Sequence, residues 1–182
     1  YEIYGESFDA TKLIHKLLNN NEESPSIFNN LNSKVNIKIN KTYLDKVTFM
    51  NGLTGNINFK NNKINQLNLK SLFPNKKKLI LTISTNKNNE KITTLYSDYP
   101  MPLIKQYKFL KGFEEGVLDF YSVKKNGVSN SVLTIDNFKL QEIPVLAKLL
   151  TLASLQGITD LLTGEGIRFT DFEMKFSNNK GL

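Results

Sequence analysis

The sequence predicts a mainly β protein with short helices, in which an antiparallel meander curls into an open, taco-like hydrophobic groove. Three observations support this fold class. Apolar and polar residues alternate through most of the chain, as in strands with one buried face. Turn-forming dipeptides separate these runs at the spacing of consecutive hairpins. One apolar stretch, residues 143–163, has helical rather than strand character and predicts a helical insert near the C-terminus.

Residues 1–34 are predicted to be a helix followed by a loop. Asp9 suits the N-cap of a helix of about ten residues, because a carboxylate at that position accepts backbone N–H hydrogen bonds. Ala10, Leu13, Ile14 and Leu17 would share one face of that helix. The polar, proline-containing stretch 19–26 then predicts a loop.

Residues 35–98 are predicted to be the β-meander, because the hydrophobic period changes to two at Val35. Turns are expected at Asn51-Gly52, Asn61-Asn62-Lys63, Pro74-Asn75 and residues 86–89. Each strand would then have one apolar and one polar face.

Residues 99–112 are predicted to form a short helix, opened by Pro100 and Pro102 and closed by Gly112. Strands then resume over residues 113–182, with a turn at Asn126-Gly127. In the last strand the apolar positions change from odd to even numbers between Phe169 and Phe172, which predicts a bulge or bend near Thr170-Asp171.

Pro144 suits the first turn of the helical insert 143–163, and Gly164 suits its stop. Its apolar stretch carries Lys148, Gln156 and Asp160, so it does not predict a membrane span. We expect two short helices hinged near Gly157, acting either as a core plug for the sheet or as a cap that touches lipid.

The whole chain of 182 residues is expected to be one structural unit. It starts at Tyr1 in mid-pattern, without a Met or a signal peptide, and ends where another strand could follow. We therefore expect a piece of a longer protein. Cysteine is absent, which excludes a disulfide framework and a thiolate metal site.

The net charge of +7 raises the question of an acidic partner such as nucleic acid. All but one of the 24 basic residues are lysines, Arg168 being the exception. Lysine lacks the planar bidentate contacts that read phosphate and guanine, so nucleic acid is not an expected partner. The densest basic run, residues 76–78, falls at a predicted turn.

An enzyme is not expected either. The single histidine, His15, has no second ligand at metal spacing, and Glu114 and Glu115 are adjacent, so on a strand they point to opposite faces. Gly164-Glu165-Gly166 lacks the third glycine of a dinucleotide loop and is interpreted as a helix stop. No catalytic residue, metal ligand or cofactor is therefore predicted.

A meander of one-sided strands can hide its apolar face under a second sheet, in a closed barrel or beneath helices. If its few helical residues do not cover the sheet, the strands must curl into an apolar trough, which would bind lipid tails. The predicted groove residues are Val35, Ile37, Ile39, Ile57, Phe59, Leu67, Leu69, Leu79, Leu81, Ile83, Leu118, Phe120, Leu133 and Ile135, with ordinary core packing as the alternative role. For the insert, the predicted residues are Leu146, Leu149, Leu150, Leu155, Ile158, Leu161 and Leu162.

A family resemblance enters at the insert. Asn137-Phe138, residues 144–150, residues 153–158 and residues 161–169 match the phrases of the C-terminal region of AsmA-like proteins of the YhdP type, which are related to TamB. Tyr4 to Asp9 resembles the phrase that opens a helix in the same family. The resemblance is specific over residues 113–182 and diffuse over 33–96, where Asn and Lys are unusually abundant.

The resemblance implies a lipid-binding segment of a bridge-like transporter that moves phospholipids between the inner and outer membranes of a Gram-negative envelope. The segment would be periplasmic, in a protein anchored in the inner membrane by parts outside this chain. It would need no cofactor, and its insert would cap or gate the trough. The alternative is a structural or assembly module of the cell envelope that docks an outer-membrane protein or a neighbouring repeat. The sequence leaves the lipid, its direction of movement and the oligomeric state open.

Overall fold

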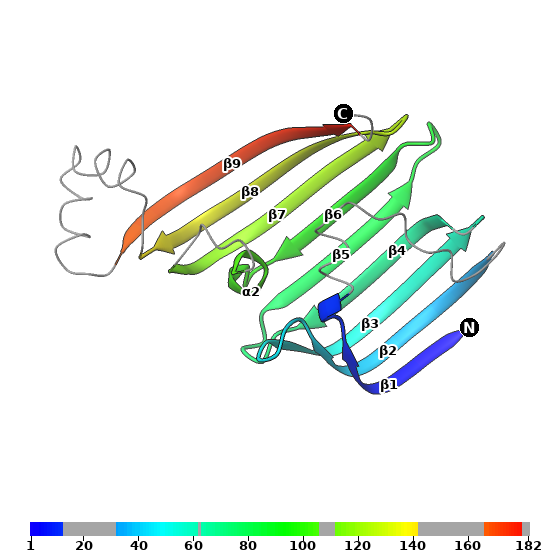
Figure 1. Cartoon of the computed structure of the whole chain (residues 1–182), viewed down its shortest axis with the longest axis horizontal. Coiled ribbons are helices and arrows are strands. Elements are labelled where there is room, and N and C mark those ends of the chain that lie inside the picture. Colours follow the sequence, from blue (N-terminus) through cyan, green and yellow to red (C-terminus); the bar gives the residue numbers. More distant parts are fainter. Residues whose placement is uncertain (13–31, 62, 106–111, 142–165, 180–182) are drawn as a thin grey trace.

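Nine strands form a single open sheet whose spatial order equals their order along the chain (Figure 1). The computed structural model describes residues 1–12, 32–61, 63–105, 112–141 and 166–179. The strands are β1 (Glu2–Asp9), β2 (Ser33–Tyr43), β3 (Phe49–Lys60), β4 (Lys63–Leu72), β5 (Lys78–Thr85), β6 (Lys91–Ser97), β7 (Phe113–Lys125), β8 (Val128–Leu140) and β9 (Ile167–Asn179). One short helix, α2 (Met101–Ile104), lies between β6 and β7. The predicted mainly β class is confirmed.

From β2 to β9, each strand is antiparallel to the next one along the chain, so the predicted meander over residues 35–98 is confirmed. The turns at residues 61–63, 74–75, 86–89 and 126–127 are confirmed as well. Asn61, Asn89 and Asn126 adopt positive φ angles of 50°, 60° and 50°, a conformation that asparagine tolerates better than most residues.

The turn predicted at Asn51-Gly52 is wrong, because both residues lie inside β3. An Asn-Gly hairpin turn needs two successive left-handed residues, and only Gly52 has a positive φ, of 60°. The chain instead turns at residues 44–48. There the Asp45 carboxylate accepts hydrogen bonds from the backbone N–H groups of Val47 and Thr48, at 2.8 and 2.6 Å.

The prediction for residues 1–34 is wrong in its first part, because Glu2–Asp9 form β1. This strand runs parallel to β2, so the sheet is not wholly antiparallel. As an edge strand, β1 is held by hydrogen bonds to β2, which lies more than twenty residues later in the sequence. The local pattern of apolar residues does not reveal such a distant pairing. At its end the Asp9 carboxylate accepts a hydrogen bond from the N–H of Thr11 at 2.9 Å, the contact expected of an N-cap.

Several predicted elements lie outside the described residues. They are the rest of the N-terminal helix and loop, the second half of the predicted helix 99–112, and the helical insert 143–163 with all seven of its named leucine and isoleucine residues. Helix α2 begins after Pro100, as predicted, and ends at Ile104.

The bend predicted near Thr170 extends across β7, β8 and β9. Before Asn137, the buried residues of β8 have odd numbers, Ser131 and Ile135. After it they have even numbers, Phe138 and Leu140. The strand therefore changes which set of side chains faces the core. Asn137 has a positive φ of 51°, and the register of β8 with β7 and with β9 is the same on both sides of it. The irregularity is therefore a kink shared by three strands and not a bulge that shifts their register.

Two apolar clusters lie where these strands meet the α2 segment. One contains Phe113, Leu118, Ile135, Phe138, Leu140 and Ile167 with Ile104 of α2, and the other contains Leu44, Met50, Phe73 and Leu79. Met101 packs on the first cluster, and Tyr99 and Leu103 on the second. The segment 99–104 thus joins both clusters at one end of the central strands.

Candidate functional site

The candidate site is one face of the sheet, defined by the pairing register. Side chains of directly paired residues project from the same face, so each chain of partners traces a row across the strands. One row crosses all nine strands without a polar side chain, and we name it the central row. It consists of Ile3, Ile37, Gly55, Leu69, Leu81, Leu95, Phe120, Leu133 and Met174.

All fourteen predicted groove residues lie on this same face. Val35, Ile57, Leu67 and Ile83 are successive partners in the row on one side of the central row, and Phe59 lies beyond Ile57 on β3. On the other side, Leu79, Leu118 and Ile135 share a row, and Ile39 lies on β2. The remaining predicted residues, Ile37, Leu69, Leu81, Phe120 and Leu133, belong to the central row.

Burial differs between positions on this face. Ile39, Leu79, Leu118 and Ile135 are buried near the α2 end, whereas the central-row residues of β2 and β4 to β8 are half-buried. At the β9 edge, Phe172, Met174 and Phe176 expose 42%, 42% and 41% of their surface. The central row is thus partly accessible, although Leu67, Ser122 and Ser131 on its other side are buried as well.

Sequence reasoning missed Leu95, Phe172, Met174 and Phe176 as members of this face. Strand β6 reads Lys-Ile-Thr-Thr-Leu-Tyr-Ser, with apolar residues at both parities, so alternation alone does not assign its faces. For β9 the even apolar positions were visible in the sequence. Pairing of Phe172 with Ile135 then shows which face they occupy.

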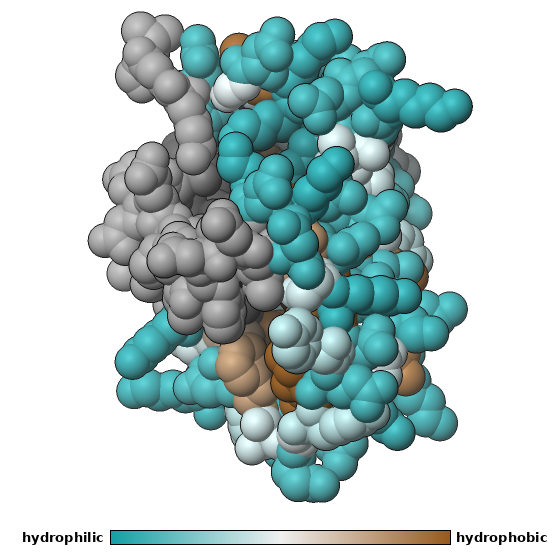
Figure 2. Space-filling model, turned by 90° about the vertical axis from the view of Figure 1, so that its right-hand side faces the viewer, coloured by the Kyte–Doolittle hydropathy of each residue, from teal (hydrophilic) through white to brown (hydrophobic). Residues whose placement is uncertain are grey.

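The opposite face is mostly polar. Asn36, Asn56, Asn68, Thr82 and Thr94 are successive partners in a row across β2 to β6. In the side view of Figure 2 the described surface is mainly hydrophilic, and hydrophobic residues gather near its lower middle. The two faces therefore differ in polarity, as the alternation predicted.

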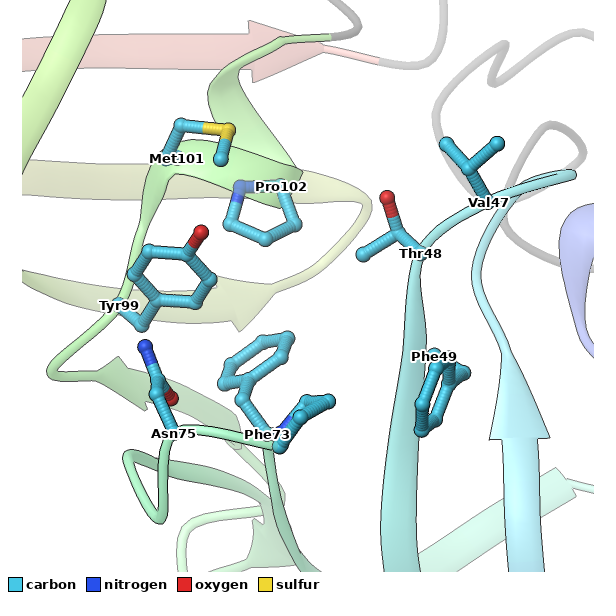
Figure 3. A pocket seen from close by; sticks show the side chains of 9 residues that line it. Val47, Thr48, Phe49, Phe73, Asn75, Tyr99, Met101 and Pro102 are labelled. Carbon is cyan, nitrogen blue, oxygen red and sulfur yellow. The ribbon is translucent and has the colours of Figure 1, made fainter.

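A pocket of about 240 Å³ opens beside the α2 segment (Figure 3). Phe49, Phe73, Tyr99 and Met101 are among the residues that line it, and the Phe73 and Tyr99 rings meet edge-on with centroids 5.2 Å apart. None of its nine described lining residues is charged, and Tyr99 is the one titratable residue among them. Its volume is below that of a typical ligand pocket.

The acidic pair considered in the sequence is engaged in surface contacts. Glu114 accepts a hydrogen bond from the Gln141 side chain at 2.6 Å, and Glu115 accepts one from Arg168 at 2.9 Å. The Arg168 hydrogen bond holds the pKa of Glu115 below its ordinary value, with the charges of Arg168 and Lys139 adding to this effect. His15 and Glu165 lie outside the described residues.

Within the described ranges, no three His, Cys, Asp or Glu side chains gather as metal ligands. In the same part of the chain, no helix has the length and hydropathy needed to cross a membrane.

In comparisons with known proteins, no family model, no curated protein and no solved structure matches the chain. The resemblance to AsmA-like proteins therefore stays a prediction. The function proposed below rests on the arrangement of the residues themselves.

Proposed function

We propose that the apolar face of the sheet binds the hydrocarbon tails of phospholipids. The chain would serve as a lipid-binding segment of a bridge-like transporter that moves phospholipids between the two membranes of a Gram-negative envelope. Binding would be passive: tails partition onto the apolar face while headgroups stay in water, and no chemical step is involved.

The central row is the observation that carries this proposal. It gives an unbroken apolar path across nine strands, from Ile3 at one edge to Met174 at the other. Between these edges its members on β2 and β4 to β8 are only half-buried, whereas an ordinary core would bury them completely. A continuous apolar path that stays partly accessible suits a long, flexible apolar ligand.

The energy available is sufficient for tail binding. Each methylene transferred from water to an apolar surface contributes about 0.8 kcal/mol. A tail of about a dozen carbons lying along the face would therefore gain roughly 10 kcal/mol before the cost of ordering it. Such binding needs no specific polar residue, which agrees with the composition of the central row.

The α2 end supports a direction for the bound tails. Two packed apolar clusters occupy that end of the face. A bound tail would therefore lie along the central row or extend from it away from α2. On this proposal the strands curl into the predicted groove, and the insert caps or gates it. The periplasmic location and the membrane anchor belong to the same proposal and are supported by the family resemblance.

The test uses two adjacent residues of β5 that point to opposite faces. Leu81 lies in the central row, and Ile80, which is 36% exposed, pairs with Tyr96 on the other face. The purified chain is expected to carry phospholipid detectable by mass spectrometry. Leu81→Asp should remove that lipid while circular dichroism still shows β structure, and the matched Ile80→Asp should keep it.

A wild-type chain that neither co-purifies with phospholipid nor takes it up from vesicles would refute the proposal. So would equal lipid loss in the Leu81→Asp and Ile80→Asp variants, because the effect would then not depend on the face.

The second candidate function, an assembly module, is favoured by the two edges of the sheet. Within the described residues, β1 and β9 each pair with a strand on one side only. An unpaired edge offers backbone N–H and C=O groups to another strand. A lipid-free chain that binds a protein through β1 or β9, and loses that binding when proline is introduced there, would favour this role.

A further inference from the structure

Two lysines stand opposite each other on the apolar face. Lys91 of β6 and Lys124 of β7 are direct cross-strand partners. Side chains two residues apart on a strand project from the same face. Lys91 therefore shares the face of Thr93 and Leu95 on β6. Lys124 likewise shares the face of Ser122 and Phe120 on β7, so both lysines project from the face that carries the central row. Both are half-buried.

This pairing is unfavourable within the folded chain. Like charges directly opposite on a sheet repel each other, and burial adds a desolvation cost. Burial lowers the pKa of Lys91, and the charges of Lys124 and of Lys63 on β4 lower it further. Among the described residues, the two charges that shift the pKa of Lys91 are thus both positive.

The neighbouring lysine shows the contrast. Lys125 points to the opposite face, and its ammonium lies 2.9 Å from a carboxylate oxygen of Glu90. Glu90 also accepts a hydrogen bond from the Asn86 side chain at 2.8 Å. The residues that flank the lysine pair in its own row, Thr85 and Ser129, are neutral.

The lysine pair also lies at a defined place on the face. Next to it, toward the central row, Ser122 and Ser131 are paired and buried, with their hydroxyl oxygens 2.9 Å apart. Two residues further on, Leu95 and Phe120 begin the apolar surface. Since a strand rises about 3.3 Å per residue, the Cα atoms of the two lysines lie roughly 13 Å from the central row. Along these strands, positive charges are followed by hydroxyl groups and then by apolar side chains. An anionic amphiphile has a matching order, with a charged headgroup followed by hydrocarbon tails.

We propose that Lys91 and Lys124 bind the phosphate of an anionic phospholipid whose tails lie on the central row. The proposal rests on the proposed function and adds to it a headgroup site and a charge preference. An anionic headgroup would offset the repulsion between the two paired ammonium groups.

The experiment compares two double variants that lose the same charge. Lys91→Gln/Lys124→Gln removes the pair, whereas Lys38→Gln/Lys70→Gln removes two exposed lysines of the opposite face. Each chain is incubated with vesicles of equal parts phosphatidylglycerol and phosphatidylcholine, re-isolated, and its bound lipids are quantified by mass spectrometry. Wild type and the control should enrich phosphatidylglycerol roughly fivefold per lysine of the pair. The site variant should bind as much lipid in total but at the vesicle ratio.

A charge-preserving variant, Lys91→Arg/Lys124→Arg, should retain the preference, which separates loss of charge from altered folding. The site variant should unfold at the same or a higher temperature than wild type, because a like-charge contact has been removed.

A wild-type chain that binds both lipids at the vesicle ratio would overturn the headgroup site while leaving tail binding intact. The headgroup site would also be overturned if Lys91→Gln/Lys124→Gln kept the preference for phosphatidylglycerol, or if Lys38→Gln/Lys70→Gln lost it. A wild type that binds neither lipid would overturn the proposed function itself. Lysine side-chain NMR signals that respond equally to inorganic phosphate alone and to phosphatidylglycerol would assign a free-phosphate site and overturn the lipid assignment.

Discussion

Gly55 determines how closely β3 and β4 approach at the centre of the apolar face. Its φ is 154°, and a Cβ built on it would lie 1.8 Å from the backbone oxygen of Asn68. The obstacle is backbone and not a flexible side chain, so it cannot move aside without disturbing the pairing of the two strands. Only glycine fits this position of the central row.

Gly55→Ala is therefore expected to lower the free energy of unfolding by about 3 kcal/mol, through steric overlap and backbone strain. Gly5→Ala is the matched control, because its nearest neighbours would lie 3.8 and 3.9 Å from the new Cβ. Urea unfolding followed by circular dichroism measures the free energy of unfolding of both variants. Equal stability of the two variants would show that β3 and β4 can separate at Gly55 without cost.

At the scale of residues, the period-two pattern predicted which face each groove residue occupies, and the register places all fourteen together. The pattern could not assign Leu95, because Ile92 and Tyr96 give its strand apolar residues on both faces. The pattern also could not distinguish Gly52, which has a positive φ inside β3, from a glycine in a turn. That difference depends on whether one or two residues adopt a left-handed backbone, which composition does not encode.

At the scale of elements, the kink shared by β7, β8 and β9 is held by aromatic and charged contacts. The rings of Phe113, Phe138 and Phe169 stack across the three strands, with centroids 5.3 and 5.1 Å apart. Glu115, with a positive φ of 61°, lies beside Arg168 of β9 and Lys139 of β8. These contacts link three strands at the point where their faces switch.

The Glu115–Arg168 contact predicts a dependence of stability on pH. The folded-state pKa of Glu115 is lowered, first by the hydrogen bond from Arg168. A lowered pKa contributes stability that is present above the unfolded-state pKa and is lost as the pH falls through the folded-state pKa. In Arg168→Gln, urea midpoints should thus differ most from wild type at neutral pH, and the difference should shrink below the ordinary pKa of glutamate.

Lys175→Gln on the same strand provides the control, because it removes an equal charge from the exposed pair with Glu173. A wild-type to Arg168→Gln difference that stays constant across the acidic range would contradict the role given to Glu115.

The sequence predicted the site of this kink from the change of parity between Phe169 and Phe172. It could not predict that the register would be retained, since that requires β7 and β8 to change face at the same level through Gly116 and Asn137. Strand β1 was missed for a related reason. Its eight residues acquire strand structure only through pairing with β2, a contact between distant parts of the chain.

At the scale of the whole molecule, the interior strands of the sheet are expected to be more stable than its edges. Strand β1 pairs only with β2 within the described residues, and Tyr1, Ile3, Tyr4 and Phe8 are exposed. Local opening costs least where few apolar contacts are broken.

Hydrogen exchange measured by mass spectrometry should therefore show β1 exchanging well before β5 to β8. Phospholipid should slow exchange in the interior strands more than in α2, because the proposed tails contact the central row. Uniform exchange across all strands would indicate that the sheet opens as one unit.

The agreement between spatial and chain order has a consequence for how the protein forms. Each hairpin from β2 to β8 can close on the one made before it, so most of the sheet can assemble progressively as the ribosome releases the chain. The two longest connections separate β1 from β2, across residues 10–32, and β8 from β9, across residues 141–166. Closure of these long connections carries the larger entropic cost, so the outermost strands should be the last to join.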